Sequence, residues 1–313
     1  MEKLYQLQCF QAAARMQNIS EAARILHVSQ PSLSQTIRRL EEDLGYPLFD
    51  RRGKRIYLNE NGEIMLRAIE RMSDIYQGAF REVEEQNGKK RREVSVYIGY
   101  ASLHLPGLLE HLKKKTPQIK YHIFQWREQG MHENDIGIVA LEGKARDYFG
   151  GESAGGSADK SAVESTGGIY RDHRYEVLFE EEIVLAVPAG HPLAKARRVC
   201  LSDLMDQELI GLNENWALGR IVSQNLQKQE LRPETTVWVD NPSLMRDLLR
   251  KGLGIALVPS LSWEGFARNE VVMKRVEDFS VSRIVCICWR RDKYLTQQER
   301  DCIRGIREYF LPT

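Results

Sequence analysis

The 313-residue sequence lacks the features that mark several common classes of protein. No apolar run approaches the roughly 20 residues that a membrane-spanning helix needs. The first residues lack the basic, apolar and small-residue order of a signal peptide, so we expect a cytoplasmic protein without a membrane partner. With 42% hydrophobic and 28% charged residues, the composition is ordinary for a globular chain of two or three domains.

Motifs of catalysis and metal binding are also missing. The sequence has no G-x-S-x-G, P-loop or dinucleotide fingerprint, and its histidines lack metal-ligand spacing. Its five cysteines form no C-x-x-C, and Cys286 and Cys288 alternate in an apolar run, which favours buried free thiols. His191 lies in a turn with no nucleophile motif nearby, which favours a structural role. We therefore expect no catalytic residue, no metal and no cofactor.

The charge is balanced overall, at a formal net +1, but the cations are unevenly spread. Arg51, Arg52, Lys54 and Arg55 place four cations within five positions, and a second run occupies residues 89–92. Such a run is often only a solvated face, so neither run identifies a nucleic-acid ligand by itself.

Short helical patterns fill residues 1–58. Apolar residues at helical spacing predict a first helix that ends near Asn18, a residue that tolerates the left-handed conformation. Ser20 is the expected cap of a second helix and Ser29 that of a third, whose first turn tolerates Pro31. Two short helices joined by a tight turn predict a helix-turn-helix.

The third predicted helix has one apolar and one polar face. At about 100° per residue, its leucines and isoleucine fall within a narrow arc that must face a core. Gln and Arg on the opposite face suit the major groove, where Gln reads adenine edges and Arg reads guanine or holds phosphate. An ordinary solvated helix face is the alternative. The inner residues are Leu33, Ile37, Leu40 and Leu44, and the outer and flanking ones are Pro31, Ser34, Gln35, Arg38, Arg39 and Glu42.

The segment after Gly45 predicts a wing. Leu48 and Phe49 form an apolar anchor, and the basic turn at 51–55 lies between two short strand-like runs. Its cations are expected to lie against phosphates, where they add affinity without sequence information.

Residues 59–88 form one long helical pattern, which Asn59 can cap. Apolar residues recur along it at seven-residue spacing, which predicts packing against a partner copy. Packing onto its own domain is the alternative. The stripe includes Met65, Ile69, Met72, Tyr76, Ala79 and Val83.

The texture of the sequence changes from Val94 onward. Short β-branched runs alternate with amphipathic segments, which predicts an α/β domain with a largely parallel sheet. Residues 150–168 contain six glycines and four serines and predict a flexible surface loop.

More than a dozen positions between Ala22 and Arg51 match one known signature. They are Ala22, Ala23, Leu26, Ser29, Gln30, Pro31, Ser32, Ser34, Ile37, Leu40, Glu41, Leu44, Gly45, Leu48, Phe49 and Arg51. This run resembles the signature of LysR-type transcriptional regulators. The resemblance implies that Gln30, Pro31, Ser34 and Gln35 approach base edges and that Arg38 and Arg51 approach DNA. Position 35 is often basic in that family, so Gln35 predicts an altered base preference. The complete set of predicted DNA-contacting residues adds Arg39, Arg52 and Lys54.

The remaining chain resembles, more loosely, the effector domain of the same family, which has the two-lobed periplasmic-binding-protein type II fold. The best match is Leu185–Ala194, at the expected crossing into the second lobe. The resemblance implies an α/β multi-domain chain: a winged helix-turn-helix at 1–58, a dimerising linker helix at 59–88 and an effector-binding domain at 93–313. The first lobe is expected at about 93–175 and 265–313, and the second at about 176–264.

In such two-lobed sheets a ligand lies in the crevice at the carboxyl ends of the strands. Ser102 matches the family's ligand-contacting position best. Trp216 is interpreted as an aromatic lid and Arg220 as an anion partner, with a structural role as the alternative for each. The helix that usually completes this pocket is shortened here to residues 125–134. The candidate effector residues are Tyr100, Ser102, His104, Asn213, Trp216, Arg220 and Asp240.

The resemblance implies a regulator that binds double-stranded DNA as a homodimer or homotetramer and responds to a small-molecule effector. An anionic compound is one candidate effector, and RNA polymerase is a further candidate partner. Two alternatives stay open. One is a DNA-binding regulator whose sensor domain is vestigial, and the other is a two-lobed enzyme, against which the lack of catalytic motifs argues.

Overall fold

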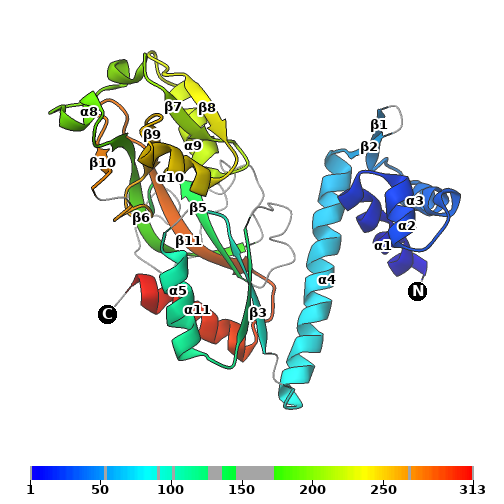
Figure 1. Ribbon diagram of the computed structural model, residues 1–313. Coiled ribbons are helices and arrows are strands. Elements are labelled where there is room, and N and C mark those ends of the chain that lie inside the picture. The colour runs from blue at the N-terminus through cyan, green and yellow to red at the C-terminus, as the bar shows by residue number, and fades with distance from the viewer. Residues whose placement is uncertain are drawn as a thin grey trace. The chain divides into compact units, whose positions relative to one another are not determined.

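The structure is a computed structural model (Figure 1) that describes residues 2–52, 55–89, 92–100, 103–125, 136–145, 173–266 and 269–311. The chain divides into two compact units, and the first consists of residues 1–87 with the short segment 292–294. No helix of the described segments is long and apolar enough to cross a membrane.

The first unit begins with the helices α1 (Glu2–Met16), α2 (Ile19–Ile25) and α3 (Gln30–Leu44). Ser29 caps α3 as predicted, because its side chain accepts the backbone N–H of Ser32 at 3.3 Å. Pro31 lies in the first turn, and Gly45 ends the helix in the left-handed conformation with a φ of 77°. The local signals of the sequence therefore set both ends of α3.

The cap of α2 differs from the expectation. The side chain of Asn18 accepts the backbone N–H groups of Ser20 and Glu21 at 3.0 and 3.2 Å. The prediction that Ser20 caps α2 is wrong, because the helix begins at Ile19 and Ser20 lies inside its first turn. Asn18 is extended, with a φ of −151°, and the left-handed residue after α1 is Gln17, with a φ of 48°.

The inner faces of these helices form one core. Leu33, Ile37 and Leu40 are at most 5% exposed and pack with Phe10 of α1. Leu44, predicted on the same face, is 39% exposed because it is the last residue of α3, where the chain turns away at Gly45. The predicted core face of α3 therefore ends at Leu40.

The strands β1 (Phe49–Arg52) and β2 (Arg55–Leu58) pair antiparallel and form the predicted wing hairpin. The Phe49 ring packs against Phe10 with centroids 5.3 Å apart. One carboxylate oxygen of Glu41 accepts the backbone N–H groups of Leu48 and Phe49 at 2.7 and 3.3 Å. The base of the wing is thus fixed to α3.

Helix α4 (Glu60–Gln86) follows the wing. Asn59 caps it as predicted, and its side chain accepts the backbone N–H of Gly62 at 2.9 Å. A β-carbon on Gly62 would lie 2.1 Å from the carbonyl oxygen of Leu48, so only glycine lets α4 start so close to the wing. Near the middle of α4, the buried Glu70 pairs with Arg15 of α1 at 3.5 Å.

The second unit is an α/β domain built on a mixed sheet. Its strands are β3 (Glu93–Ile98), β4 (Lys120–Phe124), β5 (Ile136–Glu142), β6 (His173–Pro188), β9 (Ala256–Pro259), β10 (Val271–Lys274) and β11 (Ser282–Arg290). They follow the order β10-β6-β11-β5-β3-β4, and β9 also pairs with β6. β3 pairs in parallel with β4 and β5, but β11 pairs antiparallel with β5 and β6. The expectation of a largely parallel sheet is wrong, because the chain crosses to the second lobe along β6 and returns into β11, which runs antiparallel to β6.

Each lobe has its own core. In the first, α5 (Leu105–Lys115) and α11 (Gln297–Phe310) pack on β3, β5 and β11, as Figure 1 shows. The second is built on the other half of β6. Its other elements are α8 (Pro192–Lys195), η2 (Leu201–Leu204), β7 (Leu209–Leu212), α9 (Ala217–Gln227), β8 (Thr235–Val239) and α10 (Pro242–Arg250).

The change from one lobe to the other occurs at two places in the chain. Up to Glu182, β6 pairs with β11, and from Ile183 it pairs with β9. Residues between Val271 and Val281 pack into the second core, and β11 begins directly afterwards at Ser282. The lobe limits expected near residues 175 and 265 therefore move to 182/183 and 281/282.

Candidate DNA-binding surface and effector site

The turn between α2 and α3 is tight. His27 adopts the left-handed conformation, with a φ of 53°, which is uncommon for a residue other than glycine. The backbone N–H of Val28 donates to the carbonyl of Ala23 at 3.0 Å and closes the turn. Because both helices also share one core, the turn holds α3 at a fixed angle with its outer face in solvent.

The outer face of α3 carries the polar side chains that the sequence predicts to contact DNA. The Ser20 hydroxyl lies 3.3 Å from Gln30 Oε1, which links the first residue of α3 to α2. Arg38 forms an exposed ion pair with Glu42 at 3.0 Å, a contact that water screens and that DNA phosphates can replace. Gln30, Pro31, Gln35, Arg38 and Arg39 are exposed, and Ser34 is half-buried.

The basic residues of the wing are only partly described. The backbone of Arg51 and Arg52 belongs to β1, but the structure describes neither side chain, and Lys54 lies outside the described residues. Their contact with phosphates stays a prediction.

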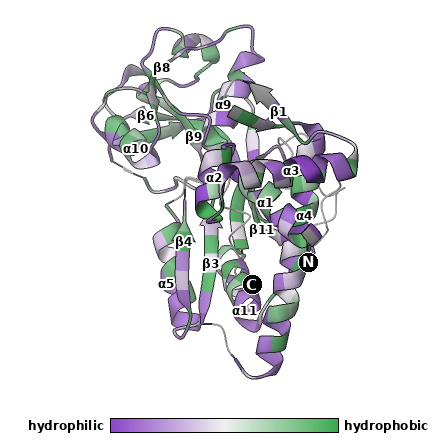
Figure 2. Cartoon of the chain, turned by 90° about the vertical axis from the view of Figure 1, so that its right-hand side faces the viewer, coloured by the Kyte–Doolittle hydropathy of each residue, from purple (hydrophilic) through white to green (hydrophobic). Residues whose placement is uncertain are grey.

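The apolar stripe of α4 divides into two parts. Met65 and Ile69 pack on the core of the first unit, and Ile69 is 5% exposed. Further along, Met72, Tyr76 and Val83 are 43%, 65% and 57% exposed. Phe80, which the spacing argument missed, is 57% exposed and lies edge-on to Tyr76 with ring centroids 5.0 Å apart. Figure 2 shows hydrophobic residues recurring along α4 among hydrophilic ones.

In the first lobe, the candidate effector residues are held by protein contacts. Tyr100 is 2% exposed, and the Arg283 guanidinium carbon lies 5.9 Å from the centre of its ring. Nε2 of His104 lies 3.1 Å from the carbonyl oxygen of Leu261, and the ring packs edge-on against Phe310. Ser102, the position with the strongest resemblance, lies outside the described residues.

In the second lobe, three candidates meet at the carboxyl ends of β7 and β8. Trp216 is 5% exposed and its indole N–H donates to the carbonyl of Asp240 at 2.9 Å. The interpretation of Trp216 as a lid is therefore wrong, because the ring belongs to the second core. The Asn213 side chain accepts the backbone N–H of Asn215 at 3.2 Å.

Arg220, interpreted from the sequence as an anion partner, contacts the loop that precedes its own helix, α9. Its Nη1 donates to the carbonyl oxygen of Glu214 at 2.8 Å, so it contributes to the shape of the loop before α9. The shortened segment from Trp126 to Asn134 and the Gly/Ser-rich segment 150–168 both lie outside the described residues.

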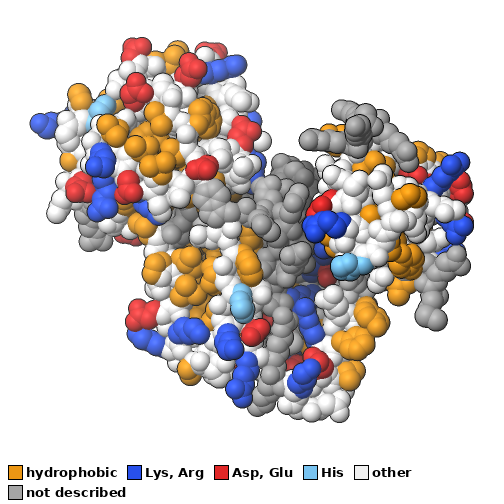
Figure 3. Space-filling model, turned by 45° about the vertical axis from the view of Figure 1, so that its right-hand side comes forward, with side chains coloured by type: hydrophobic (Ala, Val, Ile, Leu, Met, Phe, Trp, Pro, Cys, Tyr) orange, Lys and Arg blue, Asp and Glu red, His pale blue; other side chains and the backbone are white. Residues whose placement is uncertain are grey.

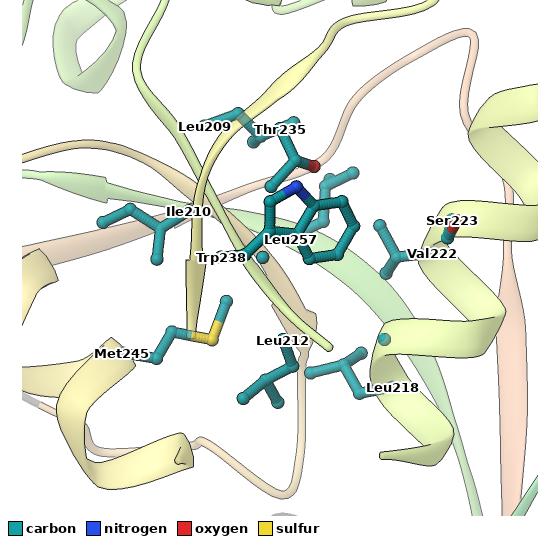
Figure 4. A pocket seen from close by; sticks show the side chains of 12 residues that line it. Leu209, Ile210, Leu212, Leu218, Val222, Ser223, Thr235, Trp238, Met245 and Leu257 are labelled. Carbon is teal, nitrogen blue, oxygen red and sulfur yellow. The ribbon is translucent and has the colours of Figure 1, made fainter. Parts of the chain in front are cut away.

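An apolar depression that the sequence analysis missed lies between the β7–β8 pair and α9 (Figure 4). Gly211 of β7 and Gly219 of α9 line it, and a β-carbon on Gly211 would lie 3.4 Å from the ring of Trp238, which is 54% exposed. None of the candidate effector residues lines it. Figure 3 shows hydrophobic side chains gathered on this lobe, at the upper left. The two glycines, each in an apolar run, were the only sequence signal for it.

Two buried thiols and one histidine have structural roles. Burial raises the pKa of the Cys286 and Cys288 thiols, so the reactive thiolate is disfavoured. His191 Nδ1 accepts the backbone N–H of Leu193 at 3.2 Å, and its Nε2 lies 3.0 Å from Gln207 Oε1, which agrees with the structural role predicted for it. Within the described ranges no group of three His, Cys, Asp or Glu side chains is placed to hold a metal ion.

Comparison with known proteins agrees with this architecture. The profile described as "Bacterial regulatory helix-turn-helix protein, lysR family" matches residues 4–63, and "LysR substrate binding domain" matches 167–311. An uncharacterized HTH-type transcriptional regulator of Bacillus subtilis, YybE, is 27% identical over 301 residues, which cover 93% of each chain. The transcriptional dual regulator GltC of the same organism is 24% identical over 314 residues, 98% of this chain and 97% of its own.

Solved structures share the fold. Full-length OxyR from Pseudomonas aeruginosa superposes with a TM-score of 0.51 at 22% identity, over 97% of this chain and 98% of its own. The effector binding domain of QuiR in complex with shikimate gives a TM-score of 0.52 at 16% identity, over 71% of this chain and 98% of its own.

Proposed function

The chain belongs to the family of LysR-type transcriptional regulators, DNA-binding proteins with an effector-binding domain, and from this premise we propose how it reads DNA. The outer face of α3 enters the major groove, and the wing lies against the phosphates beside it. The residues that contact DNA are Gln30, Pro31, Ser34, Gln35, Arg38 and Arg39 of α3 and Arg51, Arg52 and Lys54 of the wing.

The observation that carries this proposal is the exposure of the polar face of α3 on a rigid support. Gln30 and Gln35 are exposed while Leu33 and Ile37 on the opposite face are buried, so the helix presents amide groups outward. The N-terminus of α3 also carries partial positive charge, which attracts a phosphate. Gln side chains read adenine in the major groove, which favours a site that contains A·T pairs.

The protein binds its DNA site as a homodimer. A homotetramer would consist of two such dimers. The exposed half of the α4 stripe supports this, because Met72, Tyr76, Phe80 and Val83 place large apolar side chains in water. Packing them against a second copy removes this area from water and holds two reading heads at a fixed separation. A two-fold dimer then requires an interrupted palindrome as its DNA site.

The two-lobed domain binds a small-molecule effector in the crevice between its lobes. The shared fold with the effector binding domain of QuiR, which holds shikimate, supports an organic molecule of this size, and an anion is one candidate. Closure of the lobes then changes how two dimers pair on DNA, or how the protein contacts RNA polymerase. The protein acts in the cytoplasm, where the DNA is, and does not turn its effector over, in keeping with relatives named as transcriptional regulators.

Footprinting on the DNA upstream of the protein's own gene tests the DNA-binding proposal. The wild-type protein should protect an interrupted palindrome, and binding should weaken as salt rises, because phosphate contacts release counterions. Gln35→Ala should lose about tenfold or more in affinity for that site and keep its affinity for unrelated DNA. Gln8→Ala removes an exposed glutamine from α1 and serves as the matched control.

Two results would overturn this proposal. One is a folded wild-type protein that protects no sequence in the region, and the other is a Gln35→Ala variant with wild-type affinity and base preference. Thermal unfolding in the presence of small organic anions, shikimate among them, tests the effector separately. A ligand at a hundred times its Kd raises the stability by about 2.7 kcal/mol, and a lack of any stabilising compound would favour a vestigial sensor.

A further inference from the structure

A buried ion pair lies where the crossing strands leave the first lobe. Arg283 of β11 and Glu181 of β6 are register partners, and both side chains are 0% exposed. Arg283 Nε donates to Glu181 Oε1 at 2.8 Å. Two residues further along β6, Ile183 pairs with Pro259 of the second lobe. The ion pair therefore occupies the hinge between the lobes.

Glu181 also holds the loop that follows β9. Its Oε2 accepts the backbone N–H groups of Leu261 and Ser262 at 3.0 and 2.7 Å, and its Oε1 accepts the Ser262 hydroxyl at 2.6 Å. With Arg283, these donors use the whole acceptor capacity of about four lone pairs on one carboxylate. Ser262 lies 3.2 Å from Arg283 Nη2 as well, so the three side chains form one hinge cluster (Glu181, Ser262 and Arg283).

The same loop holds the start of α5 in the first lobe. The carbonyl oxygen of Ser262 accepts the backbone N–H of Leu103 at 3.0 Å, and that of Leu261 lies 3.1 Å from His104 Nε2. These two residues directly precede α5, next to the end of β3, where the first-lobe effector residues are expected. A displacement of α5 is thus passed by short, specific bonds to both crossing strands.

Stability alone does not account for a buried charge pair at this position. Apolar side chains of similar volume often stabilise a core equally well or better, whereas a buried, hydrogen-bonded pair can specify one geometry. Arg283 Nη1 is buried, and the described part of the chain offers it no hydrogen-bond acceptor. The cluster is one acceptor short in this arrangement, so a lobe movement that brings an acceptor to Nη1 would be favoured.

We propose that the hinge cluster sets the angle between the lobes by positioning the start of α5 against the crossing strands. Glu181 and Arg283 are positioning residues that act through Ser262 and not by touching the effector. A ligand bound beside Leu103 then changes the lobe angle through the bond from Leu103 to Ser262. This inference rests on the proposed function, in which the effector binds between the lobes.

Hydrogen exchange of the full-length protein tests the positioning role. Ser262→Ala removes the hydroxyl that contacts both Glu181 and Arg283 but keeps the carbonyl that accepts from Leu103. If the cluster positions that carbonyl, amides in peptides that span residues 103–107 should exchange about tenfold faster, while the rest of α5 is unchanged. Ser223→Ala is the matched control, because its hydroxyl also bonds a glutamate, Glu214 at 2.9 Å, but on the surface of α9.

The lobe angle is measured by spin-label distances between Lys114→Cys on α5 and Asp206→Cys in the second lobe, in a Cys200→Ser background, with labelled chains diluted by unlabelled ones. The Ser262→Ala protein should show a shifted or broader distance distribution. The double variant Glu181→Met/Arg283→Met should do the same, and it leaves no unpaired buried charge, so it tests the proposal if the single variant fails to fold.

Wild-type exchange at residues 103–107 together with wild-type distances in a folded variant would overturn the proposal and leave the cluster a purely structural role. Neither measurement uses DNA or effector. A wild-type protein that protects no DNA would therefore contradict the proposed function while the hinge result stands. Conversely, unchanged exchange and distances in a protein that protects DNA would contradict only the role of the hinge cluster.

Discussion

Replacing Phe80 with serine should separate two copies of the protein without unfolding either. Phe80 is 57% exposed on α4. An aromatic side chain offers about 200 Å² of surface, so roughly 110 Å² is open to a partner, and burying this area stabilises the dimer by about 2.8 kcal/mol at 25 cal/mol per Å². Both copies lose this contact. Since part of the area stays in water, we expect a total loss of about 4 kcal/mol, a thousandfold rise in the dimer Kd.

Sedimentation velocity over a concentration series measures this dissociation constant. Ile64→Ser is the matched control, because Ile64 is 60% exposed on the same helix but lies about 160° around it from Phe80, at about 100° per residue. Both variants should keep the wild-type far-UV circular dichroism at 25 °C, whereas the Tm of Phe80→Ser falls with the loss of the dimer. An unchanged dissociation constant for Phe80→Ser, or an equal loss for Ile64→Ser, would refute the packing of this stripe against a second copy.

Three further outcomes are expected. Gly62→Ala should lower the free energy of unfolding by about 1–3 kcal/mol, because the new β-carbon would lie 2.1 Å from the carbonyl oxygen of Leu48. This loss outweighs the better helix propensity of alanine. A denaturant titration that finds equal or greater stability would contradict the argument. Burial raises the pKa of Tyr121 from 10.0 to about 12, so its neutral form contributes stability that is complete below pH 10 and is lost as the pH rises towards 12. Tyr121→Phe should flatten this alkaline loss, and a phenol that ionises at its ordinary pH in absorbance titration would speak against the argument. Maleimide labelling read by mass spectrometry should modify the half-buried Cys200 first and reach Cys286 and Cys288 only after unfolding; early labels on these two would show that the strand opens in the native state.

The DNA-binding unit is the part that the sequence predicts best. Its helices, wing and caps depend on neighbours a few residues apart, so spacing and residue type carry the information, as Ser29 and Asn59 show. The errors there are local as well. Asn18 and Ser20 are both good caps, and which of them the helix uses depends on a boundary shift of one or two residues.

The effector domain follows the sequence less closely. Alternating runs predicted its strands, but not that β6 and β11 pair antiparallel in the first lobe, because strand direction depends on partners far along the chain. The polarity of Trp216 suits a ligand contact as well as a core position with one hydrogen bond, and only the packing around its indole distinguishes the two.

The sequence by itself determined the family signature, the polar outer face of α3 and the existence of an apolar stripe on α4, since each is a matter of residue type and spacing over a short stretch of chain. Tertiary structure alone decided which half of that stripe is covered and which half is exposed. It also decided that Glu181 meets Arg283, which is 102 residues away. No local pattern can signal such a pair, because a charge in a strand is buried or exposed according to what the rest of the chain places beside it.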